Sequence, residues 1–218
     1  MKRNIFLISI TLACFIFLPA SANAMHPDCV IDDVTIIDLE DQIECAIEKG
    51  LEYITAQQAG GGYWSDGYTN LAATGLMCVK YIDRAKELEL DPFDNTQYEY
   101  ADNLIAVIGH IAGNLVAGDS GELKTNVGGS YTTYTTGIAD MCFSAAAEID
   151  PNITADTGAG NLTYLEIVQG LSNWLTGNQQ ISGCAEGGWY YSEKENNLNW
   201  GDNSISGYAT MGLGFAQT

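Results

Sequence analysis

The feature that most constrains the fold of this chain is an internal repeat. A short motif, in which a hydroxyl residue and a glycine open an apolar stretch, occurs at residues 74–78, 136–142 and 206–212. Each copy follows a stretch rich in glycine and aromatic residues, at 60–64, 128–131 and 187–191. Self-similarity of this kind predicts stacked supersecondary units rather than one irregular core.

Each unit of the repeat has the pattern of a helical hairpin. Segments with a single apolar stripe predict outer helices over residues 39–57, 97–117 and 162–179. Segments that are apolar on most sides and rich in glycine and alanine predict buried inner helices over residues 69–88, 133–149 and 203–217. No strand pattern of comparable length is present. The predicted fold class is therefore all-α, with outer and inner helices alternating in a curved array.

The charge of the chain excludes several classes of partner. Its 218 residues include 28 acidic and 8 basic side chains, for a formal net charge of −20. Nucleic acid is excluded because this chain lacks the cations that would neutralise a row of phosphates. Docking to an anionic membrane surface is excluded on the same ground.

The first residues have the pattern of a secretory signal. Lys2 and Arg3 precede an apolar run over residues 5–20, and small residues follow at Ala22 and Ala24. This pattern predicts a signal peptide over residues 1–24, and so a secreted or cell-surface protein. An acidic segment over residues 25–38 and the repeat domain over 39–218 would follow. We expect no membrane span after cleavage, because no other apolar run is long enough.

Five cysteines remain after the predicted cleavage. Cys78 and Cys142 lie at equivalent points of the repeat, and we expect them to be small buried core residues. A disulfide between them is the alternative, which export would permit. The odd count leaves at least one thiol either free or paired between chains.

Residues 49–64 read KGLEYITAQQAGGGYW and closely resemble the QW motif of triterpene cyclases. The positions of that motif are filled by Lys49, Gly50, Tyr53, Ile54, Gln58, Gly62 and Trp64. A second, looser copy consists of Gly170, Trp174, Leu175 and Gln179, followed after extra residues by Gly187 and Trp189. The middle repeat lacks both the glutamine and the tryptophan.

The chain thus resembles the prenyltransferase and squalene-cyclase repeat family over about residues 40–218. The resemblance implies an α/α toroid, in which outer helices surround a ring of inner ones. It also implies structural clasps, because a glutamine amide can bond an exposed helix end while an indole packs over it. These clasps would be Gln58, Trp64, Gln179 and Trp189. Three hairpins are about half of such a ring, so we expect a copy that is incomplete at its C-terminus, or a ring completed by two chains.

The catalytic residues of the family are mostly missing. Cyclases of the squalene-hopene type protonate an alkene with a DxDD motif, which aligns here on residues 202–205, and only Asp202 matches. Asp202 is therefore the one candidate acid. Protein prenyltransferases hold zinc with Asp, Cys and His, but His110 lies among apolar residues and is expected to pack. We expect neither a metal nor another cofactor.

Aromatic residues gather near the predicted ends of the inner helices. We select Tyr68, Tyr134, Trp200 and Tyr208 as candidate ligand-binding residues, although each would serve equally as core. The leading hypothesis is an exported module that binds an apolar or extended ligand (an isoprenoid, a peptide or a glycan) without catalysis. The alternatives are a fragment of a squalene-hopene-cyclase-type isomerase, and a structural cell-surface protein that self-associates.

Overall fold

The computed structural model describes residues 39–65, 70–127, 131–192 and 201–217. The predicted signal peptide, the acidic segment 25–38 and two of the candidate ligand-binding residues, Tyr68 and Trp200, lie outside these ranges.

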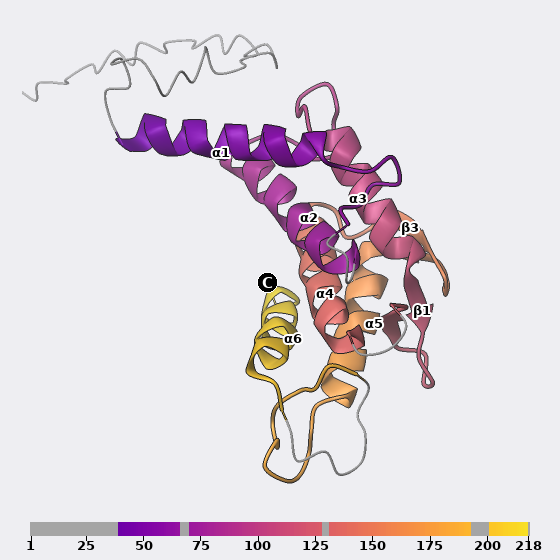
Figure 1. Ribbon diagram of the computed structural model, residues 1–218. Coiled ribbons are helices and arrows are strands. Elements are labelled where there is room, and N and C mark those ends of the chain that lie inside the picture. Colours follow the sequence, from indigo (N-terminus) through magenta and orange to yellow (C-terminus); the bar gives the residue numbers. More distant parts are fainter. Residues whose placement is uncertain (1–38, 66–69, 128–130, 193–200, 218) are drawn as a thin grey trace, which may run out of the picture.

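Within these ranges the chain is mostly helical, as predicted (Figure 1). The helices are α1 (Leu39–Ala56), α2 (Asn70–Glu87), α3 (Ala101–Gly113), α4 (Thr132–Ile149), α5 (Tyr164–Gly177) and α6 (Asn203–Phe215). Each coincides with one of the segments predicted from periodicity, and the boundaries differ by a few residues. The coarse prediction of a mainly helical protein is therefore confirmed.

The helices alternate between two positions. The inner helices α2, α4 and α6 lie side by side with α4 in the middle, and α3 and α5 pack behind them (Figure 1). Helix α4 touches α2, α5 and α6, and all of its residues from Thr132 to Ala146 are buried except Tyr134. Helix α4 can be surrounded by other helices because apolar and small side chains cover its whole circumference.

Two short β-hairpins interrupt the helical pattern. Strand β1 (Leu115–Ala117) pairs with β2 (Leu123–Thr125), and β3 (Thr154–Thr157) pairs with β4 (Gly160–Thr163), both antiparallel. The prediction that helix continues to residue 117 is wrong, because α3 ends at Gly113 and Asn114, which are poor helix formers. Residues 115 and 123 of the first hairpin are buried against the helices instead.

The repeat is visible in one recurring hydrogen bond. In each unit a hydroxyl near the start of the inner helix accepts a hydrogen bond from a backbone N–H of the chain that leads into that helix. The pairs are Trp64 N to Thr74 Oγ1 at 3.2 Å, Thr125 N to Thr136 Oγ1 at 3.2 Å, and Trp189 N to Ser206 Oγ at 3.0 Å. The middle unit, which lacks the tryptophan, keeps the bond because the N–H belongs to the backbone.

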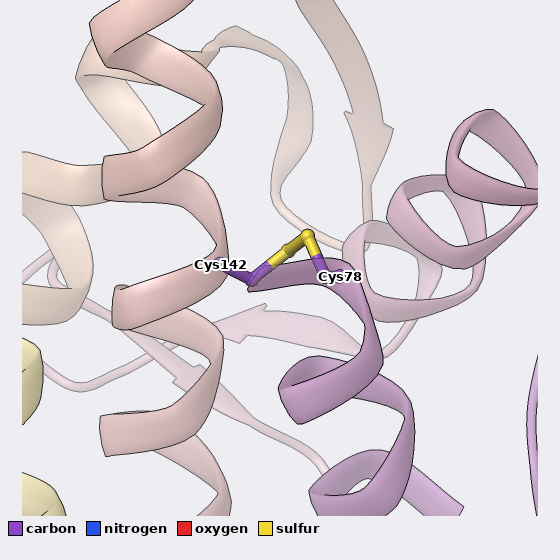
Figure 2. The surroundings of a disulfide bond; sticks show 2 residues. All are labelled: Cys78 and Cys142. Atoms are coloured by element: carbon purple, nitrogen blue, oxygen red, sulfur yellow. A yellow bond between two sulfur atoms is a disulfide. The ribbon is translucent and has the colours of Figure 1, made fainter. Parts of the chain in front are cut away.

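Helices α2 and α4 are joined by a disulfide. Cys78 and Cys142 are bonded, with their Cα atoms 5.5 Å apart (Figure 2). The expectation that they are merely packed is wrong, because the two helices cross where the cysteines face each other. The bond closes a loop of 64 residues, which would stabilise the fold by about 4 kcal/mol through loop entropy. Cys45 is also disulfide-bonded, and Cys184 is exposed and free.

Helix α1 lies across one end of α2 and extends beyond it (Figure 1). Its attachment is largely polar: the buried Arg84 of α2 contacts Glu44 at 2.8 Å and, through Nε, Glu48 at 2.7 Å. Thr55 and Tyr81 share a further hydrogen bond of 2.8 Å. None of the helices in the described part of the chain is long and apolar enough to span a membrane.

Candidate functional site

The two tryptophans of the QW-like segments make the same contact. Trp64 Nε1 donates to the carbonyl of Ile54 in the last turn of α1, and Trp189 Nε1 donates to the carbonyl of Leu175 in the last turn of α5, each at 2.8 Å. Each carbonyl also accepts a backbone N–H from just beyond the helix, from Gln57 and Asn178 respectively, so the indole adds a second hydrogen bond at the helix end. Both tryptophans therefore cap the end of an outer helix.

The two glutamines differ. Gln58 crosses from the end of α1 to the next outer helix, where its Nε2 donates to the carbonyl of Asn103 at 3.1 Å and its Oε1 accepts from the Asn103 amide. Gln179 instead donates to the carbonyl of Gly187 at 2.9 Å, within its own loop. Gln58 thus joins two outer helices, whereas Gln179 only closes the turn before Trp189.

The glycine two residues before each tryptophan has a left-handed backbone. Gly62 has a φ of +80° and Gly187 a φ of +85°, a conformation that favours glycine. At Gly62 the neighbouring helix also comes close: a Cβ there would lie 2.2 Å from the carbonyl oxygen of Ala106 in α3. At Gly187 a Cβ would have no atom of the described residues within 4 Å.

Five half-buried tyrosines gather where α4 and α6 begin, and we refer to them as the tyrosine cluster. Their ring contacts are Tyr134 with Tyr208 (4.6 Å between centroids), Tyr131 with Tyr191 (5.8 Å) and Tyr190 with Tyr191 (5.5 Å), all edge to face. Residues 190–192 run alongside the first turn of α4, where Thr133 N donates to the carbonyl of Tyr191 at 3.1 Å. The cluster thus combines rings from two inner helices and the loop before α6.

Part of the cluster belongs to a small core. Tyr134 and Tyr191 pack against a buried group formed by Trp174, Leu175, Trp189, Ile205 and Ala209. The remaining ring surface is accessible, since all five tyrosines are neither fully buried nor fully exposed. Of the predicted ligand residues, Tyr134 thus packs on this core, and Tyr208 contacts the ring of Tyr134.

Asp202 is the N-cap of α6. Its Oδ1 accepts from the N–H groups of Ser204 and Ile205 at 2.9 and 3.1 Å, and its Oδ2 accepts from the hydroxyl of Tyr191 at 3.2 Å. The hydrogen bonds, led by the one from the Ser204 hydroxyl, lower the pKa of this carboxyl below its usual value. Asp202 is thus ionised at neutral pH and ties the tyrosine cluster to the start of α6.

A second carboxyl, Asp140, lies in the middle of α4 and is completely buried. Its Oδ2 accepts from the Ser172 hydroxyl of α5 at 3.0 Å, whereas its Oδ1 has no hydrogen-bond partner. Burial raises the pKa of Asp140 to about 7, against a smaller lowering effect of Ser172. Desolvation disfavours the charged form, so Asp140 titrates near neutrality.

His110 stacks on the ring of Tyr63, with 4.7 Å between the ring centroids. Burial lowers its pKa, opposed by a hydrogen bond with the backbone of Gly61. It therefore packs against the QW-like loop, as predicted for a histidine among apolar residues. In the described ranges no three His, Cys, Asp or Glu side chains come together as metal ligands.

The sequence analysis missed several residues that shape this region. Tyr131, Tyr190 and Tyr191 were seen only as parts of glycine-rich stretches, although Tyr131 directly precedes α4 and the other two lie in the loop before α6. Asp140 is the only acid within the apolar part of its helix, and that isolation is a signal that could have identified it. Arg84 is the buried one of the three cations on α2, and it lies opposite the regularly spaced glutamates of α1.

Comparison with models of known families, with curated proteins and with solved structures finds no match to this chain.

Proposed function

We propose that this chain is an exported α/α-repeat module that binds an extended ligand at the tyrosine cluster, without catalysis. The half-exposed rings of Tyr131, Tyr190 and Tyr208 at the shared start of α4 and α6 are the observation that supports it. Tyrosine offers an apolar ring and a polar hydroxyl together, at a low cost in conformational entropy. We include in the proposal the α/α toroid that the QW-like motifs imply. The alternation of inner and outer helices supports it.

The geometry favours one group among the expected ligands. A cluster of half-exposed rings with hydroxyl groups suits a ligand that has both apolar and polar faces, such as a glycan or an extended peptide. A pure hydrocarbon such as an isoprenoid would offer no hydrogen-bond partner to the tyrosine hydroxyls that it covers, which is costly when they are desolvated. Asp202 and the net charge of −20 also favour a neutral or cationic ligand over an anionic one.

The alternatives have less support. A squalene-hopene-cyclase-type fragment needs an acid that protonates an alkene, and Asp202 has a lowered pKa and serves as a helix cap. A purely structural role would not account for the half-exposed rings of the tyrosine cluster.

The test is a binding screen with neutral oligosaccharides and with extended peptides, followed by calorimetry on the hits. We expect a micromolar ligand, and we expect Tyr131→Ala/Tyr190→Ala to weaken its binding about tenfold, a loss of roughly 1.4 kcal/mol. Tyr53→Ala is the matched control, because Tyr53 is 69% exposed on α1, away from the cluster. The proposal would be contradicted if the double variant and the Tyr53→Ala control weakened binding equally, or if neither weakened it.

A further inference from the structure

The inner helices contact one another in a repeated register. A Cβ at Gly75 of α2 would lie 2.5 Å from Cγ2 of Ile138 in α4, and a Cβ at Gly137 of α4 would lie 2.7 Å from the carbonyl oxygen of Tyr208 in α6. Ile138 follows Gly137, and Tyr208 follows Gly207. Both junctions therefore follow one rule. The motif glycine of one inner helix contacts the residue that comes directly after the motif glycine of the next inner helix. We call the helix with the contacting glycine the receiving side and the other helix the inserting side.

A second contact obeys the same register. It joins the residue three positions after the first glycine to the residue five positions after the second. In the α2–α4 junction these are Cys78 and Cys142, which form the disulfide (Figure 2). In the α4–α6 junction they are Asp140 and Gly212, where a Cβ on Gly212 would lie 3.2 Å from Cβ of Asp140. Two different pairs of helices thus share one mode of packing.

At α6 the receiving side of this register is uncovered. Around Gly207, the counterpart of Gly75 and Gly137, no atom of the described residues lies within 4 Å of the Cβ position. Thr210 and Met211 beside it are exposed. In the outer layer, no atom of the described residues lies within 4 Å of the Cβ position of Gly187, whereas the Cβ position of Gly62 lies against α3.

At α2 the inserting side of the register is uncovered. Leu76 follows Gly75 and is 36% exposed, although its counterpart Ile138 is fully buried. Lys80 lies five positions after Gly75, where α4 has Cys142, and its side chain is 66% exposed. The two ends of the array thus present the two complementary halves of one junction.

We propose that α6 of one copy of this chain and α2 of a second copy form a head-to-tail interface in this register. Leu76 of the second copy packs at Gly207 of the first, and Lys80 of the second copy lies at Thr210 of the first. Such a heterologous contact repeats until the copies close into a ring or extend into a filament.

The charge distribution favours a second copy at this place. The chain is strongly acidic, so most contacts between two copies would bring carboxylates together. Helix α6 carries no charged side chain, and Leu76 and Lys80 add none that is negative. Asp83 lies beside Lys80 but is paired with it at 3.3 Å, so the proposed junction has no net negative charge and is a place where two acidic molecules can meet.

The test is disulfide trapping of the full chain with Cys184→Ser, which removes the exposed free thiol. By analogy with the bonded pair Cys78 and Cys142, Lys80→Cys/Thr210→Cys should form disulfides between copies on oxidation. We expect at least about ten times more cross-linked species on a non-reducing gel than either single variant gives. Asp83→Cys/Thr210→Cys is the mismatched control, since Asp83 lies one turn further along α2. Equal cross-linking of the matched and mismatched pairs would overturn the proposal.

A second measurement does not depend on oxidation. Gly207→Leu should fill the receiving position and shift the chain from assemblies to monomers in sedimentation velocity, with its melting temperature retained. Gly109→Leu on α3 is the matched control, because Gly109 also has no atom within 4 Å of its Cβ position. A wild-type chain that stays monomeric at high concentration, or an assembly that Gly207→Leu leaves intact, would argue against this interface.

Discussion

At the scale of single residues, the glycines of the two QW-like segments show how one motif serves two purposes. Gly62 and Gly187 share a left-handed backbone, and each places a tryptophan two residues later over the end of an outer helix. Only Gly62 is also a contact point, since α3 packs directly on it. Glycine at the same motif position therefore contributes differently to stability in the two copies.

This difference can be measured as free energy of unfolding in urea. Gly187→Ala should cost about 1–2 kcal/mol, the cost of a left-handed backbone for a residue with a Cβ. Gly62→Ala should cost at least twice as much, because its Cβ would also collide with the carbonyl of Ala106. Equal losses in the two variants would show that α3 does not pack on Gly62 in solution.

Asp140 predicts a dependence of stability on pH. Its pKa rises from an ordinary 3.8 when unfolded to about 7 when folded, so the folded state binds more protons between those values. Stability from this group is fully present below about pH 4 and is lost as pH rises to about 7, by up to about 4 kcal/mol. Asp140→Asn imitates the protonated acid and should abolish this loss.

The measurement is the difference in unfolding free energy between variant and wild type, taken from pH 4 to pH 8. We expect this difference to grow in favour of Asp140→Asn as pH rises. Asp119→Asn, a change of an exposed acid next to β1, should show no such growth. A flat difference for Asp140→Asn would mean that the carboxyl is not desolvated.

At the scale of elements, α1 stands apart from the other helices. Only Cys45 and Leu51 of its residues are buried, and Leu39, Ile43 and Tyr53 are exposed. Its docking depends strongly on Arg84, whose pKa is raised; burial would lower it, but the hydrogen bonds to Glu48, Glu44 and Glu87 outweigh that effect. A buried cation with several carboxylate partners holds an element whose apolar contacts are few.

Arg84→Met should therefore release α1. We expect a loss of about 3 kcal/mol, because the carboxylates of Glu44 and Glu48 would be left near a low-dielectric surface without their cation. Amide hydrogen exchange should show lost protection in α1 and retained protection in α4. Lys86 is also on α2 and forms an exposed pair with Glu148 of α4, so Lys86→Met should cost less than about 1 kcal/mol. Comparable losses from the two variants would contradict the anchoring role of Arg84.

At the scale of the whole molecule, the packing is uneven along the array. Helix α4 is covered by neighbours on every side, while α6 has only three buried residues, Ile205, Ala209 and Gly212. In a repeat protein each unit is stabilised by its neighbours, so the terminal units are the weakest. The disulfide between α2 and α4 strengthens one internal junction, and the proposed head-to-tail contact would add to the stability of the two terminal helices.

The sequence by itself determined the element pattern. Hydrophobic periodicity placed the six described helices because a helix that buries one stripe and a helix that is buried all round have distinct patterns. The resemblance to the QW motif implied that Trp64 and Trp189 would lie over helix ends, and each indole donates to a carbonyl in the last turn of an outer helix. These are local features, and they depend on residues that are near one another in the chain.

Only the tertiary structure decided which distant residues meet. The pairing of Cys78 with Cys142, the burial of Arg84 between glutamates of another helix, and the orphaned oxygen of Asp140 all depend on how the helices cross. The tyrosine cluster likewise required two helices and a loop to converge at one place. A crossing angle and register are set by packing across the interface, and the periodicity of a single helix carries no information about them.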